Sequence, residues 1–337
     1  MKIKLYFFLP MLILSLIGAV SCANSRNNKI EETEETTKKE IPVPAFNADS
    51  AYTYIKKQTD FGPRVPNTAA HRNCSEYLIG QMNKFGAKVI TQNADLVAWD
   101  GKVLKSTNII GSYNPENQKR ILLCAHWDSR PYADNDPDKK NHRTPIDGAN
   151  DGASGVGVLM EIARQIQLKQ PPLGIDIIFF DSEDYGTPQF EKTNGNIEDT
   201  WCLGAQYWGR RPHVDGYHAR FGILLDMVGG KNSTFYYEGF SRETASSPMK
   251  KIWKEAHKAG FGNYFIKQDG GYVTDDHNYV YQYAHIPCVD IINYDPTCQQ
   301  SSFGPTWHTV NDTFENIDIN TLKAVGQTVM NVIYKEQ

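Results

Sequence analysis

Four short apolar runs, each leading into acidic or histidine side chains, constrain this chain more than any other feature. The runs are residues 121–125, 175–180, 221–225 and 286–292, and they lead respectively to His126 with Asp128, to Glu183 with Asp184, to Asp226, and to a loop that holds His308. Short runs rich in β-branched residues predict strands that are buried on both faces. Such strands require helices above and below their sheet.

Helical patterns flank and separate these runs. Apolar residues recur at helical spacing from Cys74 to Phe85, residues 156–167 form a second pattern, and residues 322–333 form a third. Gly86 is placed to end the first of these helices. Together the patterns predict a layered α/β domain with a mainly parallel sheet. In such sheets ligands bind at the carboxyl ends of the strands, which is where the acidic and histidine side chains lie.

Composition excludes several classes of protein. The 337 residues carry 35 basic and 39 acidic side chains, a net charge of −4. Charged residues at 22% and hydrophobic residues at 40% are typical of a globular chain, not a disordered one. We expect no nucleic-acid partner, because such a protein needs a basic face.

The sequence of the first 43 residues predicts a secretory signal followed by a flexible tether. Lys2 and Lys4 precede an apolar stretch over residues 5–20, so residues 1–21 are interpreted as a secretory signal peptide. Cys22 at its end resembles the lipidated cysteine of bacterial lipoproteins, and a plain signal with an incidental cysteine is the alternative. One acylated residue would anchor the chain to a membrane without spanning it. We therefore expect an exported lipoprotein, periplasmic or associated with the outer membrane.

This interpretation divides the rest of the chain into two segments. Residues 22–43 are almost devoid of apolar side chains, so they cannot offset the entropy of ordering and are predicted to be a flexible tether. Residues 44–337 are then a single catalytic domain, a size that suits one hydrophobic core, and we expect it to be a monomer.

The polar side chains at the strand ends are suited to a metal ion. Imidazole and carboxylate donors together favour Zn²⁺. The candidates are His126, Asp128, Asp151, Glu183, Asp184, Asp226, Asp276, His277 and His308. Asp151 stands in a small-residue loop whose glycines would let the backbone approach an ion closely. By itself that loop could also cradle an anion, but the basic residues that a phosphate site needs are missing.

Glu183 and Asp184 are neighbours, so on an extended segment their side chains point apart and cannot share one role. One can bind the metal while the other acts as acid or base toward a substrate. A solvated turn is the alternative for an isolated pair. The buried run directly before this pair favours the functional interpretation.

Seven short motifs, taken in order, carry a family resemblance. They are FGPR (61–64), AHWDS (125–129), GANDGASG (148–155), FFDSED (179–184), LLDMVGG (224–230), DDH (275–277) and WHT (307–309). Over residues 51–334 the chain resembles the zinc-dependent aminopeptidase family, most closely its glutaminyl cyclase branch. The resemblance implies a three-layer sandwich, in which helices flank a central mixed, mostly parallel sheet.

The resemblance also implies roles for the site residues, and these differ between branches. In the two-zinc peptidases the ligands would be His126, Asp151, Asp184, Asp226 and His308, with Asp151 bridging and Glu183 as general base. In the cyclases a single zinc would be held by Asp151, Asp184 and His308. Glu183 would then shuttle the proton, and Asp226 and Asp276 would be its catalytic partners. His126, Asp128 and His277 are left for a second metal or for support.

Three features favour the cyclase branch. Trp307 directly precedes His308, the acid before His277 is doubled, and an insert covers residues 130–147. The implied activity is that of an acyltransferase that converts N-terminal Gln of peptides or proteins to pyroglutamate and releases ammonia. The alternative is a two-zinc aminopeptidase that removes N-terminal residues. A binding module without activity is disfavoured, because no ligand and no Glu is missing.

Two departures from animal cyclases stand out. The chain has Asp184 where they have Glu, and Asp290 where they have His. Trp307, Trp201 and Asp290 are expected to form the substrate pocket.

The six cysteines are an even number, which in an exported chain suggests disulfides. If Cys22 carries lipid, five remain and at least one is free in a monomer. Cys124 and Cys288 lie in predicted buried strands and are expected to be core thiols. Cys202 and Cys298, in predicted loops, are the favoured pair.

Overall fold

The structure is a computed structural model that describes residues 42–192 and 198–336. The predicted signal peptide 1–21, Cys22 and all but the last two residues of the predicted tether 22–43 lie outside the described residues. Contacts between Cα atoms group Glu40–Gln337 into one compact unit. In the described part of the chain, no helix is both long and apolar enough to cross a membrane.

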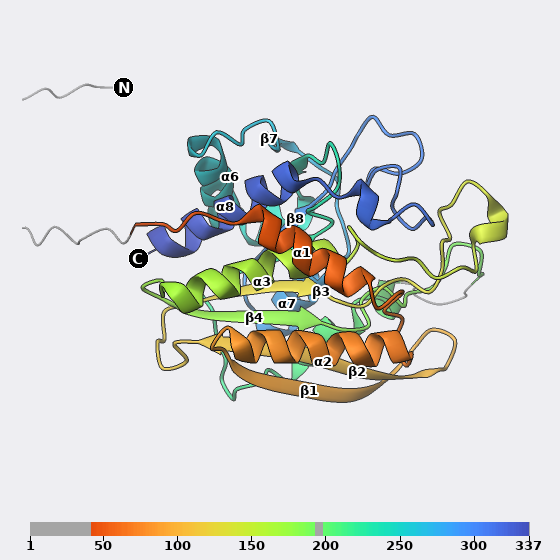
Figure 1. Ribbon diagram of the computed structural model, residues 1–337, viewed down its shortest axis with the longest axis horizontal. Helices are drawn as coiled ribbons and strands as arrows, with labels where there is room; N and C mark the ends of the chain where they lie inside the picture. Colours follow the sequence, from red (N-terminus) through yellow and green to blue (C-terminus); the bar gives the residue numbers. More distant parts are fainter. Residues whose placement is uncertain (1–41, 193–197, 337) are drawn as a thin grey trace, which may run out of the picture. The chain divides into compact units, whose positions relative to one another are not determined.

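A six-stranded mixed sheet forms the centre of this unit (Figure 1). Its strands, in spatial order, are β1 (Lys88–Val97), β2 (Val103–Tyr113), β4 (Gly174–Phe180), β3 (Arg120–His126), β5 (Gly222–Asp226) and β8 (Cys288–Ile292). The pairs β4–β3, β3–β5 and β5–β8 are parallel, and the pairs β1–β2 and β2–β4 are antiparallel. A separate pair, β6 (Phe235–Tyr237) and β7 (Phe265–Asp269), is also parallel.

Helices cover both faces of the large sheet, as Figure 1 shows. One layer contains α1 (Ala48–Thr59), α2 (Ala69–Lys84), α3 (Ala153–Leu168), α6 (Ser246–Lys258) and α8 (Ile319–Lys335). The other contains α4 (Leu203–Arg210) and α7 (Asp276–Ala284). The short helices α5 (Gly239–Thr244), η1 (Lys139–Asn141), η2 (Glu198–Thr200) and η3 (Phe314–Asn316) complete the described elements.

Alternation along the strands explains the two layers. In β3, Ile121 and Leu123 pack into the core beneath α1, α2, α3 and α8, while Leu122 and Cys124 pack into the core beneath α4 and α7. Successive side chains of a strand point to opposite faces, so a continuous apolar run fills both cores. This confirms the predicted three-layer α/β sandwich with a mixed, mostly parallel sheet.

The four predicted runs are the four parallel strands β3, β4, β5 and β8. The antiparallel edge, β1 and β2, was not predicted from the sequence. In β1 exposed and half-buried residues alternate, and its composition is largely polar, so it lacks the apolar signal of a buried strand. An antiparallel strand at the edge of a sheet can face water on one side, which removes that signal.

The cysteine prediction was partly wrong. Cys124 and Cys288 are buried core thiols, as expected. Cys202 and Cys298 do not form a disulfide, and Cys74 is free as well. Cys202 is buried just before α4, whereas Cys298 lies in a partly exposed loop, so their predicted common location in loops was misleading.

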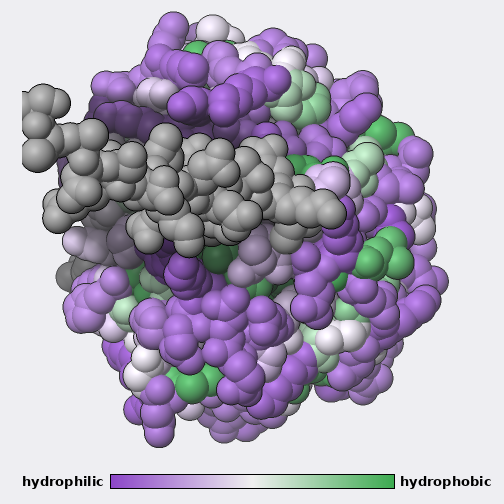
Figure 2. Space-filling model, turned by 90° about the vertical axis from the view of Figure 1, so that its left-hand side faces the viewer, coloured by the Kyte–Doolittle hydropathy of each residue, from purple (hydrophilic) through white to green (hydrophobic). Residues whose placement is uncertain are grey.

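The face shown in Figure 2 is largely hydrophilic where described residues are visible, with hydrophobic residues scattered across it. Scattered apolar side chains are ordinary for the surface of a globular domain.

Candidate metal and active site

The order of the strands assembles the predicted ligands at one edge of the sheet. His126 is the last residue of β3 and Asp226 is the last residue of β5, its neighbour. Glu183 and Asp184 follow β4, the neighbour on the other side. Parallel strands end at the same edge, so residues 100 positions apart in the chain come together there.

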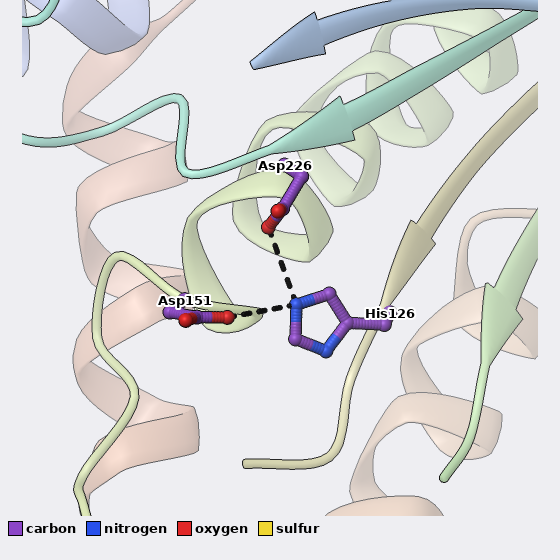
Figure 3. A group of neighbouring side chains, drawn as sticks. All are labelled: His126, Asp151 and Asp226. Atoms are coloured by element: carbon purple, nitrogen blue, oxygen red, sulfur yellow. Dashed lines mark hydrogen bonds and ion pairs between the residues drawn. The ribbon is translucent and has the colours of Figure 1, made fainter. Parts of the chain in front are cut away.

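Among the described residues, four groups of side chains have the spacing of metal ligands, and two of them share Asp151. His126, Asp151 and Asp226 form the first of these two, which we call the His126 group (Figure 3). The Nε2 atom of His126 lies 3.1 Å from Asp151 Oδ1 and 3.2 Å from Asp226 Oδ1, and the second contact is a hydrogen bond. All three side chains are buried. The imidazole of this group therefore already has a partner within the protein.

Asp151, Asp184 and His308 form the second group, which we call the His308 group. His308 Nε2 lies 3.5 Å from Asp151 Oδ2 and 3.3 Å from Asp184 Oδ1. Asp151 thus belongs to both groups and turns one carboxylate oxygen toward each histidine. In each group, one ligand atom from every residue lies within 4.8 Å of the others.

The donor atoms fit a metal ion in chemistry as well as in spacing. Imidazole nitrogen and carboxylate oxygen are both zinc ligands. The buried Oδ2 atom of Asp184 has no hydrogen-bond partner. Because buried polar atoms are nearly always paired in folded proteins, such an atom indicates an unmet interaction.

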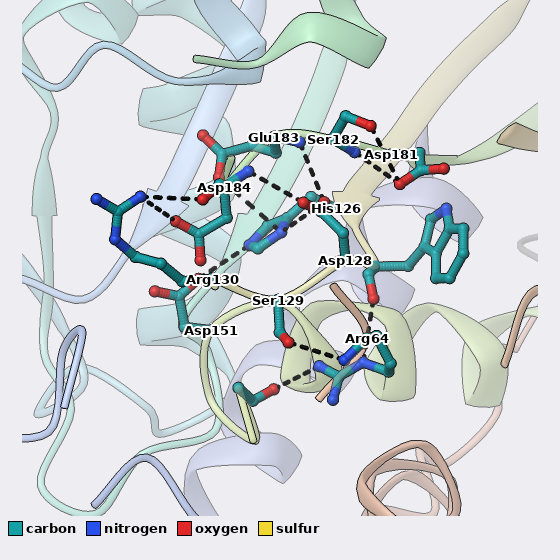
Figure 4. Close-up of polar contacts among 12 residues, drawn as sticks. Arg64, His126, Asp128, Ser129, Arg130, Asp151, Asp181, Ser182, Glu183 and Asp184 are labelled. Carbon is teal, nitrogen blue, oxygen red and sulfur yellow. Dashed lines mark hydrogen bonds and ion pairs between the residues drawn. The ribbon is translucent and has the colours of Figure 1, made fainter. Parts of the chain in front are cut away.

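Buried carboxylates position the loops that carry the ligands. Asp128 accepts hydrogen bonds from the backbone N–H groups of Glu183 and Asp184, both at 3.1 Å (Figure 4). Asp312 does the same for Asn150 and Asp151, at 2.8 and 3.0 Å. Asp128, predicted as a metal or supporting residue, is therefore placed to orient the turn that holds Asp184.

Backbone geometry explains why the loop before α3 needs glycine. Gly152 has φ of 100°, and a Cβ atom there would lie 2.7 Å from Cε1 of His126. His308 has φ of 52° and Ser182 φ of 57°, in the left-handed region that residues with side chains seldom adopt. Strained backbone of this kind is concentrated at functional sites.

Glu183 lies beside both groups. Its Oε2 atom is 4.0 Å from His126 Nδ1, and Cys202 donates a hydrogen bond from Sγ to its Oε1 at 3.1 Å. Burial raises the pKa of Glu183 well above its ordinary value, although the charge of His126 opposes the rise, and Asp184 adds to it. Burial likewise raises the pKa of Asp226 to about 7.

A small pocket of about 70 Å³ opens onto these residues. Its lining comprises Asp151, Glu183, Asp184, Trp201, Asp226, Met227, Val273, Thr274, Asp275, Ile292, Phe303, Trp307 and His308. The Trp307 ring stacks on the imidazole of His308 at 3.8 Å, and the Trp201 ring stacks on it at 5.9 Å. The pocket thus combines an aromatic wall with a carboxylate-rich floor.

Some predicted site residues do not line this pocket. Asp276 and Asp290 are fully buried and are not part of its lining, whereas Asp275 is. His277 is buried between Glu238, at 3.1 Å from its Nε2, and Asp290, at 3.6 Å from its Nδ1. The structure therefore brings His277 and Asp290 together with Asp275, as a group of potential ligands that shares no residue with the His126 and His308 groups.

Sequence reasoning missed several residues that contact the site. Arg130 and Asp134 form a buried ion pair beside His308, and Cys202 contacts Glu183. Arg130 follows AHWDS directly, and Asp134 stands four residues later in the insert, so this spacing was a usable signal. Nothing in the sequence around Cys202 or Asp312 indicated their partners.

Comparison with known proteins yields both sequence and structural matches. A model of peptidase family M28 matches residues 108–333. The glutaminyl cyclase of Bacteroides thetaiotaomicron, solved with N-acetylhistamine, is 61% identical, with a TM-score of 0.86, over 88% of this chain and 100% of that one. A structure described as a leucine aminopeptidase precursor from the same organism is 60% identical, with a TM-score of 0.85, over 88% and 100% of the two chains.

More distant relatives match over a smaller share of their length. The glutaminyl-peptide cyclotransferase of Boiga dendrophila is 24% identical over 247 residues, which is 66% of this chain and 63% of that protein. The chain thus matches slightly less than two thirds of this curated relative.

Proposed function

The chain belongs to peptidase family M28, and from that premise we propose that it is a zinc-dependent glutaminyl-peptide cyclotransferase. Its substrates are peptides or proteins with N-terminal Gln, and its products are pyroglutamate and ammonia. The main support is the arrangement of the His308 group, which opens into a small aromatic pocket with Glu183 at its side. The glutaminyl cyclase that is 61% identical supports the same activity.

We propose one zinc ion per chain, held by Asp151, Asp184 and His308. The His126 group has the same kinds of donor, but His126 Nε2 is already hydrogen-bonded to Asp226. His308 Nε2 contacts its two carboxylates at longer range, and Asp184 Oδ2 has no hydrogen-bond partner. When bound, zinc supplies a Lewis acid that polarises the γ-carboxamide carbonyl of the substrate.

Glu183 performs the proton transfers in this proposal. It accepts a proton from the α-amine, whose nitrogen attacks the γ-carbonyl carbon of the same residue. A ring C–N bond forms, Glu183 returns the proton to the amide nitrogen, and the bond from the γ-carbon to that nitrogen breaks, so that ammonia departs. Attack within one molecule needs little ordering beyond what the pocket supplies. Asp226, which lines the pocket together with Glu183, orients the amine, and Asp276, which is buried outside the pocket lining, supports this arrangement.

Trp307 and Trp201 provide the apolar wall that excludes water from the reacting atoms. Both rings stack on the imidazole of His308, so they also limit its motion. Asp290 contacts His277 and does not line the pocket.

A two-zinc aminopeptidase is the second candidate. Both histidine groups are complete and share Asp151, as a two-metal site requires, and the neighbour described as a leucine aminopeptidase precursor is 60% identical. Asp151 would then bridge the ions, and Glu183 would be the general base for water.

One pair of assays separates the two candidates. Incubation with Gln-peptides should release ammonia, and incubation with Leu- or Ala-peptides should release no amino acid. Metal analysis should find close to one zinc per chain. Release of free amino acids together with two zinc ions would overturn the cyclase proposal.

We also propose that the chain is an exported lipoprotein, anchored through acylated Cys22 and followed by a flexible tether to about residue 43. Support comes only from the sequence of residues 1–43. Recovery of Cys22→Ser in the soluble fraction, with wild type in the membrane fraction, tests this anchor.

A further inference from the structure

The carboxylate of Asp134 lies behind the imidazole of His308. Its Oδ1 atom is 3.4 Å from Nδ1 of His308, on the opposite side of the ring from Nε2, which faces Asp151 and Asp184. The side chains of Asp134 and His308 are 0% and 3% exposed, so water does not compete for this contact.

Asp134 is itself held rigidly. Arg130 donates from Nε to Oδ1 at 2.7 Å and from Nη2 to Oδ2 at 2.6 Å, and the backbone N–H of Gln189 donates to Oδ2 at 2.8 Å. A bidentate Arg–carboxylate pair fixes the orientation of the carboxylate better than a single hydrogen bond does. The capacity that remains on Oδ1 is directed toward His308.

Arg130 links this pair to a second ligand. Its Nη1 atom lies 2.9 Å from the backbone oxygen of Asp184 and 3.4 Å from Oδ1 of the same residue. The guanidinium also lies over the ring of Trp201, 4.4 Å from its centroid. One buried side chain thus contacts Asp184, which belongs to the His308 group, and Asp134 and Trp201, which contact the imidazole of His308.

We propose that Asp134, held by Arg130, is a positioning residue that fixes the tautomer and orientation of His308 and thereby sets the zinc affinity of the His308 group. The inference rests on the proposed zinc site. His308 Nδ1 makes no hydrogen bond in the structure, and the Asp134 Oδ1 atom at 3.4 Å is the carboxylate oxygen beside it. A proton on Nδ1 directed at Asp134 leaves Nε2 with the lone pair that faces Asp151 and Asp184. Carboxylates that accept from the far nitrogen of a metal-bound histidine act in this way, and their loss typically weakens metal binding by about 10- to 100-fold.

The insert offers a matched control. Asp136 is also buried and accepts hydrogen bonds from the backbone of Asp138 and Val310 and from the side chain of Asn141. It stands two residues from Asp134 and supports the same loop without contacting the His308 ring in the described contacts. Asp136→Asn therefore perturbs the insert but leaves the imidazole contact intact.

Zinc affinity is measured on the metal-depleted full chain by competition with a zinc-chelating dye, with circular dichroism recorded for every variant. We expect Asp134→Asn to bind zinc about 10- to 100-fold more weakly than wild type. Asp136→Asn should remain within about twofold of wild type, since the carboxylate behind the imidazole is unchanged. Equal losses in the two variants, or no loss in Asp134→Asn, would overturn the proposal.

Two further variants keep the test decisive. In a His308→Gln background, Asp134→Asn should cause no additional loss of affinity, because coupled residues are not additive; a full additional loss would contradict the inference. If Asp134→Asn does not fold, Arg130→Lys replaces it and should also weaken zinc binding, because Lys cannot form the bidentate pair. Unchanged affinity in a folded Arg130→Lys then counts against the proposal.

These measurements need no turnover. A chain whose zinc affinity depends on Asp134 but which releases no ammonia from Gln-peptides would refute the proposed function and leave this inference standing. A wild-type chain that binds no zinc would refute both.

Discussion

The two ends of the central sheet both bury charged side chains, but only one end satisfies them. Near the amino ends of β3 and β4, Arg120 donates to both oxygens of Asp176, at 2.7 and 2.9 Å. The hydroxyl groups of Ser112 and Tyr217 also donate hydrogen bonds to the Asp176 carboxylate, at 2.6 and 2.8 Å. Remaining donors of Arg120 go to backbone carbonyls, among them that of Asn114. This network needs no further partner.

At the carboxyl ends of the same strands, buried donors and acceptors are left over. His126 Nδ1, Asp184 Oδ2 and His308 Nδ1 have no hydrogen-bond partner. Unsatisfied buried groups cost stability and persist only where something else compensates for them. The difference teaches that burial of charge alone does not mark a functional site, since the buried charges at the amino ends are paired whereas candidate ligand atoms at the carboxyl ends are not.

Glu183→Gln should abolish most of the activity at the carboxyl ends of the strands without disturbing the structure there. We expect kcat for Gln-peptides to fall by about 10²- to 10⁴-fold, the usual contribution of a positioned acid–base group. Zinc content and the free energy of unfolding should stay close to wild type, because the amide keeps the shape of the side chain. The exposed Glu76→Gln is the control. Activity retained in Glu183→Gln would remove this residue from the mechanism.

Asp176→Ala, at the amino ends of the strands, should have the opposite effect and lower stability without lowering activity. Removal of one partner from a buried ion pair leaves Arg120 uncompensated, which typically costs about 3–5 kcal/mol of stability. Urea denaturation measures this loss, with the exposed Asp215→Ala as control. The folded fraction should keep its zinc and its kcat. A specific loss of kcat without loss of stability would contradict the structural role of this network.

Comparison of His308→Gln with His126→Gln tests which of the two histidine groups at the carboxyl ends of the strands binds zinc. We expect the first to weaken zinc binding by more than about 100-fold, since loss of a ligand exceeds loss of a group behind it. His126→Gln should still bind one zinc, because His126 is hydrogen-bonded to Asp226 within the protein. Metal titration of both variants decides the point. If both lose zinc equally, the two groups act as one two-metal site.

Cys202→Ala should have the smallest effect. The thiol donates to Glu183 Oε1, and the Cys202 backbone N–H donates to the Glu183 carbonyl at 2.9 Å. Loss of the side-chain bond should lower kcat about fivefold, equivalent to about 1 kcal/mol, the typical net value of one hydrogen bond. Cys202→Ser retains a donor and should recover most of the activity. Equal kcat in the two variants would show that this contact does not position Glu183.

The parts of the site that sequence predicted are those carried by local patterns. Asp226 and His126 end apolar runs, and a strand whose end is visible in sequence also reveals where its functional side chains lie. Glu183 and Asp184 were separable into different roles because neighbours on an extended chain point apart. The predicted disulfide between Cys202 and Cys298 was wrong, because the residues next to a cysteine in sequence do not indicate which distant residue it contacts in space.

By itself, the sequence determined the layered α/β architecture, the edge of the sheet that carries the chemistry, and the residue types suited to zinc. Each follows from periodicity or composition within a few residues. Only the tertiary structure decided that Asp134 lies behind the ring of His308, and that Asp276 and Asp290 lie outside the pocket lining. Those outcomes depend on strand order, loop paths and packing between distant segments, which no local pattern encodes.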